Sequence, residues 1–217
     1  MWTKICGFTN QETAIAAVDS GANAVGLNFY QPSARYVEPS VAKHICDAVG
    51  GNAMRIGLFV NEPIGSIRET VQSVGLDAIQ LHGDENAAEV VRVIRELPTK
   101  GVIKAFNVDE RGLGHVVSFL SDCAKLGVVP WAILLDASVA GERGGTGHVA
   151  PWATIQHQYD ESWPDLILAG GLNVNNVAEA INTVQPWGID VASGVESSRG
   201  VKDASLIEEF LSVSRKL

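Results

Sequence analysis

The chain has 217 residues, of which 46% are hydrophobic and 19% are charged, and its formal net charge is −9. This composition supplies enough apolar material for one large core and excludes a disordered chain. The acidic balance argues against nucleic acid as a partner, because nucleic-acid binding rewards clustered lysine and arginine. An anionic small substrate remains compatible with it where loops and helix N-termini concentrate positive potential.

Cysteine usage and the start of the chain predict the compartment. The three cysteines are an odd number without metal-ligand spacing, which favours a reducing environment and no disulfide framework. Strand-like sequence begins at Trp2 and leaves no room for a signal peptide. No apolar run approaches the roughly 20 residues of a membrane helix. We therefore expect a cytoplasmic protein with no membrane partner.

Short runs rich in valine, isoleucine and leucine recur along the chain, with helical patterns between them. The predicted strands cover residues 2–6, 24–29, 55–60, 78–81, 102–106, 131–136, 166–169 and 189–192. The clearest helical spacing lies at 87–97, and Pro98 and Gly101 end that helix. The same spacing predicts helices around 174–181 and 206–211.

This alternation predicts parallel strands buried on both faces. An open doubly wound sheet would give the same local signals, but eight strands in so short a chain favour a closed (β/α)₈ barrel. We expect residues 1–217 to form this single domain. The longest irregular stretch, 137–149, follows the sixth predicted strand, and long loops in compact domains are often functional.

Two of the predicted strands end in reactive side chains. Cys6 ends the first strand and Asp136 ends the sixth. Each has a plainer interpretation, since buried cysteines are usually inert and a carboxylate often caps a loop. Together, at one barrel mouth, they form a base and an acid on either side of a substrate. Cys46 and Cys123 lie within helical patterns and are predicted to be structural.

Glycine-rich loops follow the last two predicted strands. Gly170 and Gly171 come after the seventh strand, and Ser193 and Gly194 come after the eighth. Such a pair is typical of phosphate binding in (β/α)₈ enzymes, although either loop alone is often only a turn. A short helix starting near Gly194 would direct its positive end toward a phosphate.

Two further loops contain candidate ligand-binding residues. Arg35 follows the second strand, where Pro32 and Tyr36 indicate an ordered loop; its guanidinium either binds a carboxylate in bidentate fashion or is solvated. His82 and Asp84 follow the fourth strand, but no second histidine is spaced to complete a metal site. We therefore expect no metal.

The ordered set of motifs resembles the phosphoribosylanthranilate isomerase family of tryptophan biosynthesis. The motifs are Lys4-Ile-Cys-Gly7, Phe29-Tyr-Gln-Pro-Ser-Ala-Arg-Tyr-Val37, Val60-Asn61, Gln80-Leu-His-Gly-Asp84, Leu135-Asp136, Gly144-Gly-Thr-Gly147, Ala169-Gly-Gly-Leu172, Ser193-Gly-Val-Glu196 and Gly200-Val-Lys-Asp203. Single motifs are shared with other phosphosugar barrels, whereas the ordered set is specific to this family.

The resemblance implies an Amadori rearrangement of N-(5-phosphoribosyl)anthranilate without a metal or organic cofactor. It implies Cys6 as the general base that removes the C2′ proton and Asp136 as the acid that protonates the ring oxygen. It implies Arg35 as the binder of the anthranilate carboxylate, and Gly171 and Gly194 with their neighbours as the phosphate site. The substrate is thus a small phosphorylated molecule, and the oligomeric state is left open.

The chain departs from the family pattern at three positions. Ala34 replaces a proline beside the loop arginine, His148 replaces a lysine after the Gly-Gly-Thr-Gly motif, and Arg199 replaces a proline before Gly200. None of these changes removes a proposed catalytic group.

The implied roles carry a protonation problem. A cysteine thiol ordinarily has a pKa of about 8.5 and an aspartic acid one of about 3.9, so the proton favours the wrong partner by about 6 kcal/mol. We hypothesise that the site narrows this gap when substrate binds. Lys4 helps only if the pleat is regular, which would place it on the same side of the strand as Cys6.

Two other classes of protein, another phosphosugar-barrel enzyme and a non-catalytic binding barrel, share parts of this pattern. A pentose-phosphate epimerase or an aminoaldose isomerase of histidine biosynthesis resembles the chain in its phosphate loops. Those enzymes use metal-binding histidines or a pair of aspartates, respectively, where this chain has His82 alone and Cys6. A non-catalytic phosphosugar-binding barrel has no need of both an acid and a base.

Overall fold

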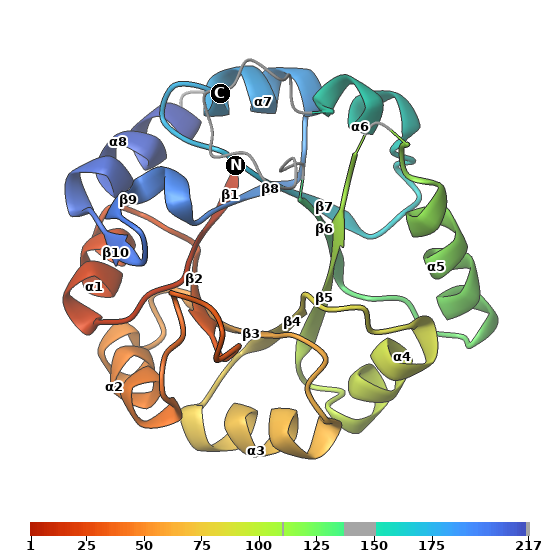
Figure 1. Ribbon diagram of the computed structural model, residues 1–217, viewed down its shortest axis with the longest axis horizontal. Coiled ribbons are helices and arrows are strands. Elements are labelled where there is room, and N and C mark those ends of the chain that lie inside the picture. Colours follow the sequence, from red (N-terminus) through yellow and green to blue (C-terminus); the bar gives the residue numbers. More distant parts are fainter. Residues whose placement is uncertain (110, 137–150, 216–217) are drawn as a thin grey trace.

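The computed structural model describes residues 1–109, 111–136 and 151–215, in which eight parallel strands close into a barrel (Figure 1). The strands are β1 (Trp2–Cys6), β2 (Ala24–Asn28), β3 (Met54–Phe59), β4 (Ala78–Leu81), β5 (Gly101–Asn107), β6 (Ala132–Asp136), β7 (Asp165–Ala169) and β8 (Gly188–Val191). The pairing of β1 with β8 closes the sheet and excludes the open doubly wound alternative. The predicted (β/α)₈ barrel is confirmed, and each predicted strand end lies within one residue of its observed position.

A ring of helices surrounds the barrel (Figure 1). The helices are α1 (Gln11–Asp19), α2 (Pro39–Val49), α3 (Ile64–Val74), α4 (Ala87–Glu96), α5 (Gly114–Lys125), α6 (Trp152–Gln158), α7 (Val177–Val184) and α8 (Ala204–Ser214). The predicted helix at 87–97 is confirmed, and a reciprocal capping box between Asn86 and Glu89 starts it. Helix α7 begins only at Val177, so Val174 of the predicted helix lies in the preceding loop. The irregular stretch 137–149 lies outside the described residues.

Strand pleating sorts side chains between two apolar cores. In β6, Ile133 and Leu135 pack in the cluster shared with the helices, whereas Ala132 and Leu134 pack in the cluster inside the barrel. Side chains alternate with a period of two, so Asp136 points into the barrel at the carboxyl end of the strand.

Three tryptophans close the opposite end of the barrel. Trp2 stacks on Trp187 with 4.9 Å between ring centroids, and Trp131 meets both rings edge-on. Trp2 and Trp131 also pack against the cluster inside the barrel. The interior is therefore filled from this end, and polar side chains gather at the other.

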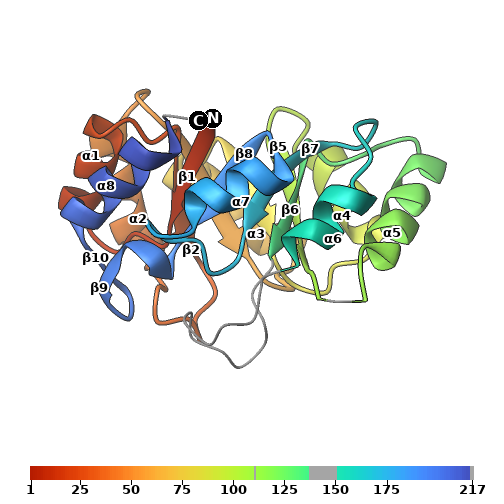
Figure 2. The same cartoon turned by 90° about the horizontal axis from the view of Figure 1, so that it is seen from above.

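A small hairpin that the sequence patterns did not predict follows β8. Strands β9 (Glu196–Ser198) and β10 (Val201–Lys202) pair antiparallel and lead into α8. The hairpin lies on the face of the barrel opposite the N-terminus (Figure 2). It contributes Glu196 and Lys202 to the mouth described below.

Candidate active site

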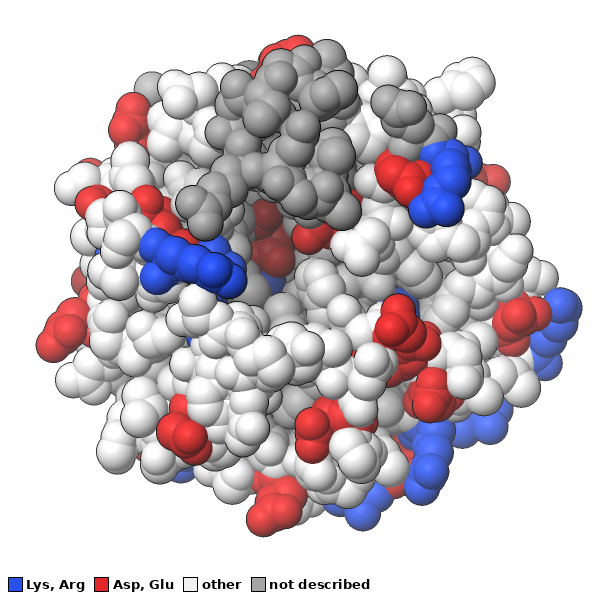
Figure 3. Space-filling model, viewed as in Figure 1, with Lys and Arg blue, Asp and Glu red and all other residues white. Residues whose placement is uncertain are grey.

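The carboxyl ends of the strands surround a pocket of about 510 Å³. In the space-filling view the centre of the ring is hollowed, and charged side chains of both signs are visible at it (Figure 3). The walls come from the ends of the strands and from the loops that follow β2, β7 and β8. Chemistry at this face is the general arrangement of (β/α)₈ enzymes.

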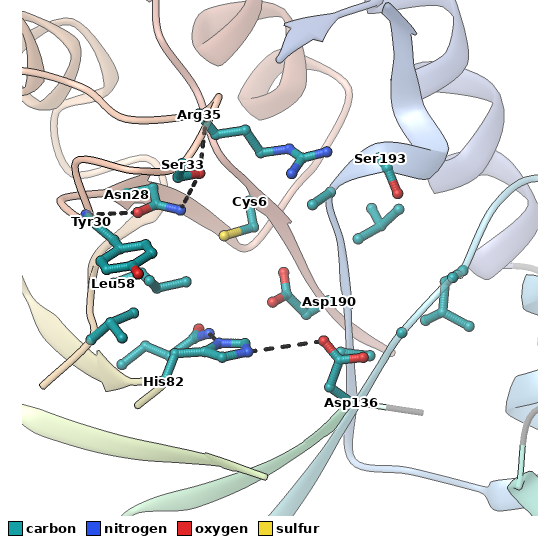
Figure 4. A pocket seen from close by; sticks show the side chains of 18 residues that line it. Cys6, Asn28, Tyr30, Ser33, Arg35, Leu58, His82, Asp136, Asp190 and Ser193 are labelled. Carbon is teal, nitrogen blue, oxygen red and sulfur yellow. Dashed lines mark hydrogen bonds and ion pairs between the residues drawn. The ribbon is translucent and has the colours of Figure 1, made fainter. Parts of the chain in front are cut away.

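Cys6 and Asp136 line this one pocket from β1 and β6, two strands that are not neighbours in the barrel. Both side chains project into the cavity (Figure 4). Cys6 is 6% exposed, whereas the Asp136 side chain is 21% exposed. A thiol and a carboxyl group thus face one shared cavity. Cys46 and Cys123, which were predicted to be structural, are buried in α2 and α5.

Lys4 lies deeper in the barrel than Cys6, on the same side of β1. Its ammonium is fully buried, and Nζ donates a hydrogen bond to Oδ2 of Asp190 at 2.8 Å. A Cβ atom at Gly26 would lie 2.8 Å from Cys6 Sγ and 3.0 Å from Lys4 Cε, so this glycine gives both side chains their room. The pleat is therefore regular, and Lys4 is positioned to act on Cys6.

Burial raises the pKa of the Cys6 thiol, and this effect is larger than the opposing charges of Lys4 and Lys202. The Asp190 carboxylate raises the pKa of Cys6 further. In the ligand-free site the thiol is therefore favoured over the thiolate. Lys4 and Lys202 partly offset the effect of burial but do not bring the pKa of Cys6 below its ordinary value.

The loop after β7 presents two glycines to the pocket. Gly170 and Gly171 have φ angles of +93° and +64°, a region that side chains disfavour. The side-chain amides of Asn173 and Asn176 donate to the Gly171 carbonyl at 3.2 and 3.0 Å. These bonds fix the conformation of the loop at Gly171.

In the loop after β8, Ser193 lines the pocket and Gly194 does not. Ser193 begins a single 3₁₀ turn, Ser193–Val195, which is the short helix expected near Gly194. A Cβ atom at Gly194 would lie 1.8 Å from the carbonyl oxygen of Leu172, so the glycine allows the two loops to touch. Arg199 is exposed and lies outside the pocket wall.

The loop that contains Arg35 is ordered by two side chains of its own. Asn28 accepts a hydrogen bond from the Tyr30 backbone and donates to Ser33 Oγ, which in turn accepts from the Arg35 backbone. The loop predicted from Pro32 and Tyr36 to be ordered is held by these hydrogen bonds. The Arg35 side chain crosses Gly7, where a Cβ atom would lie 2.5 Å from Cδ.

Arg35 is held by Glu196 in a bidentate ion pair. Nε and one terminal nitrogen donate to the two carboxylate oxygens at 2.6 and 2.8 Å. Lys202 donates to the same carboxylate at 2.8 Å and to the Ala192 carbonyl at 2.9 Å. Burial alone would raise the pKa of Glu196, but the hydrogen bonds from Arg35 and Lys202 lower it to about 2. The carboxylate thus stays ionised and fixes the guanidinium at the mouth.

His82 reaches the pocket from the loop after β4. Its Nε2 lies 3.9 Å from Asp136 Oδ2 (Figure 4). The side-chain amide of Gln80 lies 2.8 Å from Nδ1 of His82. Burial lowers the pKa of His82, so the imidazole is neutral near pH 7. Within residues 1–109, 111–136 and 151–215, no three histidine, cysteine or carboxylate side chains converge as a metal-binding group.

Sequence patterns did not identify Gln80, Asp190 or Glu196 as site residues, and they left the role of Lys4 open. The sequence did contain a signal for Lys4, Gln80 and Asp190. Each is a polar residue in an otherwise buried strand, at one of the alternate positions whose side chains face the barrel interior. Glu196 carried no such signal. Its pairing with Arg35 joins loops 161 residues apart.

Together, the fold and the pocket define a (β/α)₈-barrel enzyme in which a cysteine, an aspartate and two glycine-containing loops meet at the carboxyl ends of the strands. The chain matches a family model described as N-(5'phosphoribosyl)anthranilate (PRA) isomerase over residues 3–213. It is 39% identical over 215 residues to the N-(5'-phosphoribosyl)anthranilate isomerase of Thermotoga neapolitana, which covers 99% of this chain and 98% of that protein. The relative from Pelobacter propionicus is 40% identical over 214 residues, covering 98% and 95% of the two chains.

Solved structures of isomerases from this family are also similar to this chain. The crystal structure of phosphoribosyl anthranilate isomerase from Thermotoga maritima has a TM-score of 0.88 at 36% identity and covers both chains fully. A complex of such an isomerase with reduced 1-(o-carboxyphenylamino)-1-deoxyribulose 5-phosphate has a TM-score of 0.84 at 35% identity, again over both full chains. The present chain belongs to the N-(5′-phosphoribosyl)anthranilate isomerase family. It is an isomerase of tryptophan biosynthesis that acts on a small phosphorylated substrate, as the motifs predicted. No described helix is long and apolar enough to cross a membrane.

Proposed function

We propose that Cys6 is the general base and Asp136 the general acid of the Amadori rearrangement. The observation that carries this assignment is that the two side chains, from non-adjacent strands, line the same pocket as the glycine loops after β7 and β8. Arg35 binds the anthranilate carboxylate, while Gly170, Gly171 and Ser193 contact the phosphate. Gly194 contributes by letting its loop approach Leu172 rather than by direct contact.

The reaction begins when Asp136 gives its proton to the ring oxygen of the furanose. The C1′–O bond breaks, and the lone pair of the anthranilate nitrogen forms an iminium with C1′. This positive nitrogen acidifies the neighbouring C2′–H, so the Cys6 thiolate removes that proton. The C2′–H electrons form the C1′=C2′ bond, and the π electrons of the C1′=N bond return to the nitrogen. The enol then tautomerises to the ketone by moving its hydroxyl proton to C1′. The substrate's own nitrogen is the electron sink, which is why the mechanism needs no cofactor.

The same arrangement accounts for substrate orientation. Glu196 occupies two donors of Arg35, and the remaining terminal nitrogen is left to meet a carboxylate from the pocket side. The phosphate lies across the mouth at the loops after β7 and β8. Binding at both ends holds C1′ and C2′ between Cys6 and Asp136.

We further propose that the whole chain, residues 1–217, is one barrel domain and that it works in the cytoplasm. The three described cysteines are free thiols, and Cys6 has to stay reduced to act as a base. A reducing compartment provides that condition.

The direct test is conversion of N-(5′-phosphoribosyl)anthranilate by the purified protein in the presence of EDTA, with C2′-protonated and C2′-deuterated substrate. We expect turnover in EDTA and slower conversion of the deuterated substrate under single-turnover conditions, because proton removal from C2′ is part of the chemical step. Absence of turnover with freshly prepared substrate would contradict the proposal. Equal rates for the two substrates would contradict the assignment of a rate-contributing base.

A further inference from the structure

Gln80 is a fully buried polar residue whose side chain touches His82. It lies on β4 between Ala78, which packs inside the barrel, and His82 at the mouth. Its Nε2 lies 2.8 Å from Nδ1 of His82, and its Oε1 is buried with no hydrogen-bond partner among the described residues. An apolar side chain would fill this space without leaving an oxygen unpartnered. What Gln80 contributes at this position is therefore the amide N–H that faces His82.

The two ring nitrogens of His82 face different side chains. Nδ1 faces Gln80, and Nε2 lies 3.9 Å from Asp136 Oδ2. A hydrogen bond between His82 and Asp136 requires this distance to shorten to about 3 Å. The charges around the ring come from every side: Lys4 on β1, Lys104 on β5, and Asp136 and Asp190 on β6 and β8. Burial and the two lysines favour the neutral ring over the imidazolium, whereas the two carboxylates oppose this.

A neutral imidazole has one donor nitrogen and one acceptor nitrogen. An amide N–H donated by Gln80 makes Nδ1 the acceptor, which leaves the ring proton on Nε2. That N–H then points at Asp136.

We propose that Gln80 is a positioning residue: its amide holds His82 as the Nε2–H tautomer, so that His82 donates a hydrogen bond to one oxygen of Asp136. The proposal rests on the role of Asp136 as the general acid. The N–H from His82 orients the Asp136 carboxyl group and stabilises the carboxylate that forms when the proton departs.

The first experiment reads the tautomer in the wild-type protein and needs no variant to fold. In ¹⁵N-labelled protein near pH 7, with the His82 resonances assigned from their loss in His82→Asn, we expect a protonated Nε2 and an unprotonated Nδ1. A protonated Nδ1 would overturn the proposal. This readout does not depend on turnover, whereas retained activity in Asp136→Asn would overturn the acid assignment, so the two failures are distinguishable.

The second experiment compares two substitutions of similar size. Gln80→Met removes the donor, and Gln80→Glu replaces it with an acceptor that favours the opposite tautomer. We expect kcat to fall roughly tenfold in Gln80→Met and further in Gln80→Glu, with KM changed less than about twofold. Gln158→Met is the matched control, because Gln158 Oε1 accepts from the Leu113 backbone at 2.8 Å outside the site. The control should lower stability and leave kcat unchanged. Full kcat in Gln80→Met would overturn the proposal.

Discussion

Lys4 and Asp190 form a buried ion pair directly behind Cys6, with 2.8 Å between Nζ and Oδ2. Lys4 and Cys6 share one face of β1, and Asp190 comes from the neighbouring strand β8. Removing one partner of such a pair leaves an uncompensated charge in the barrel. The pair therefore links the stability of the interior to the ionisation of the proposed base.

Lys4→Met should change both the stability of the protein and the pKa of Cys6. We expect a loss of about 3–5 kcal/mol in the free energy of unfolding, because Asp190 is left buried without its cation. The pKa of Cys6 should rise further, since Lys4 lowers it in the wild type. Urea unfolding measures the first effect, and the pH dependence of Cys6 alkylation measures the second.

Lys43→Met is the matched control for this lysine. Lys43 pairs with Asp47 on the exposed surface of α2, where such a pair contributes about 0.3–0.5 kcal/mol. Its loss should leave Cys6 alkylation unchanged. An unaltered pKa of Cys6 in Lys4→Met would show that Lys4 does not act on the thiol.

The dependence of kcat/KM on pH should reflect the raised pKa of Cys6. In the reactive form of the enzyme, one of the two groups carries a proton: Cys6 is a thiolate and Asp136 is a carboxylic acid. Raising pH through the pKa of Cys6 removes that last proton, so activity should fall there. Because the free-enzyme pKa of Cys6 is raised, kcat/KM should stay level through about pH 8.5 and fall only above it. A fall centred below pH 8 would contradict this order of ionisation.

Arg35→Ala should act mainly on substrate binding. The anthranilate carboxylate is remote from C1′ and C2′, and a charge-assisted hydrogen bond is worth about 1.5–3 kcal/mol. We therefore expect KM to rise about 10- to 100-fold with kcat changed much less. Arg55→Ala is the control, because Arg55 makes an equivalent bidentate pair with Asp77 away from the pocket. An unchanged KM with a collapsed kcat in Arg35→Ala would place the arginine in the chemistry.

Gly194→Ala tests the contact between the two phosphate loops. The added Cβ would lie 1.8 Å from the Leu172 carbonyl oxygen, so the loops have to separate. We expect a loss of about 1–3 kcal/mol in stability and a higher KM. Gly65→Ala in α3 is the control, since its Cβ would meet no described atom within 4 Å, and it should stabilise the helix by about 0.5–1 kcal/mol. A KM equal to the wild type in Gly194→Ala would separate this contact from phosphate binding.

The barrel could be predicted from the sequence because its signals are local. Each strand is a short apolar run, and strand pleating alone carries Cys6 and Asp136 to the interior at the carboxyl ends. Eight such strands in one closed sheet leave little freedom in where those side chains point.

Other parts of the site depend on contacts that no local pattern encodes. The pairing of Arg35 with Glu196 joins two loops across the mouth, and the close approach of Gly194 to Leu172 joins two more. The net effect of burial and charge on Cys6 likewise follows from packing rather than from residue order. The Gly144–Gly147 motif and His148, where the chain departs from the family pattern, lie outside the described residues.

The most direct measurement is kcat/KM in EDTA for the wild type, Cys6→Ala and Asp136→Asn, followed by the loss of substrate fluorescence. Loss of a general base or acid should lower the rate by about 10²–10⁴ in each variant while the fold is retained. Cys46→Ala, which removes a buried cysteine from α2, should keep wild-type activity. Near-full activity in Cys6→Ala or Asp136→Asn would contradict the central assignment of base and acid.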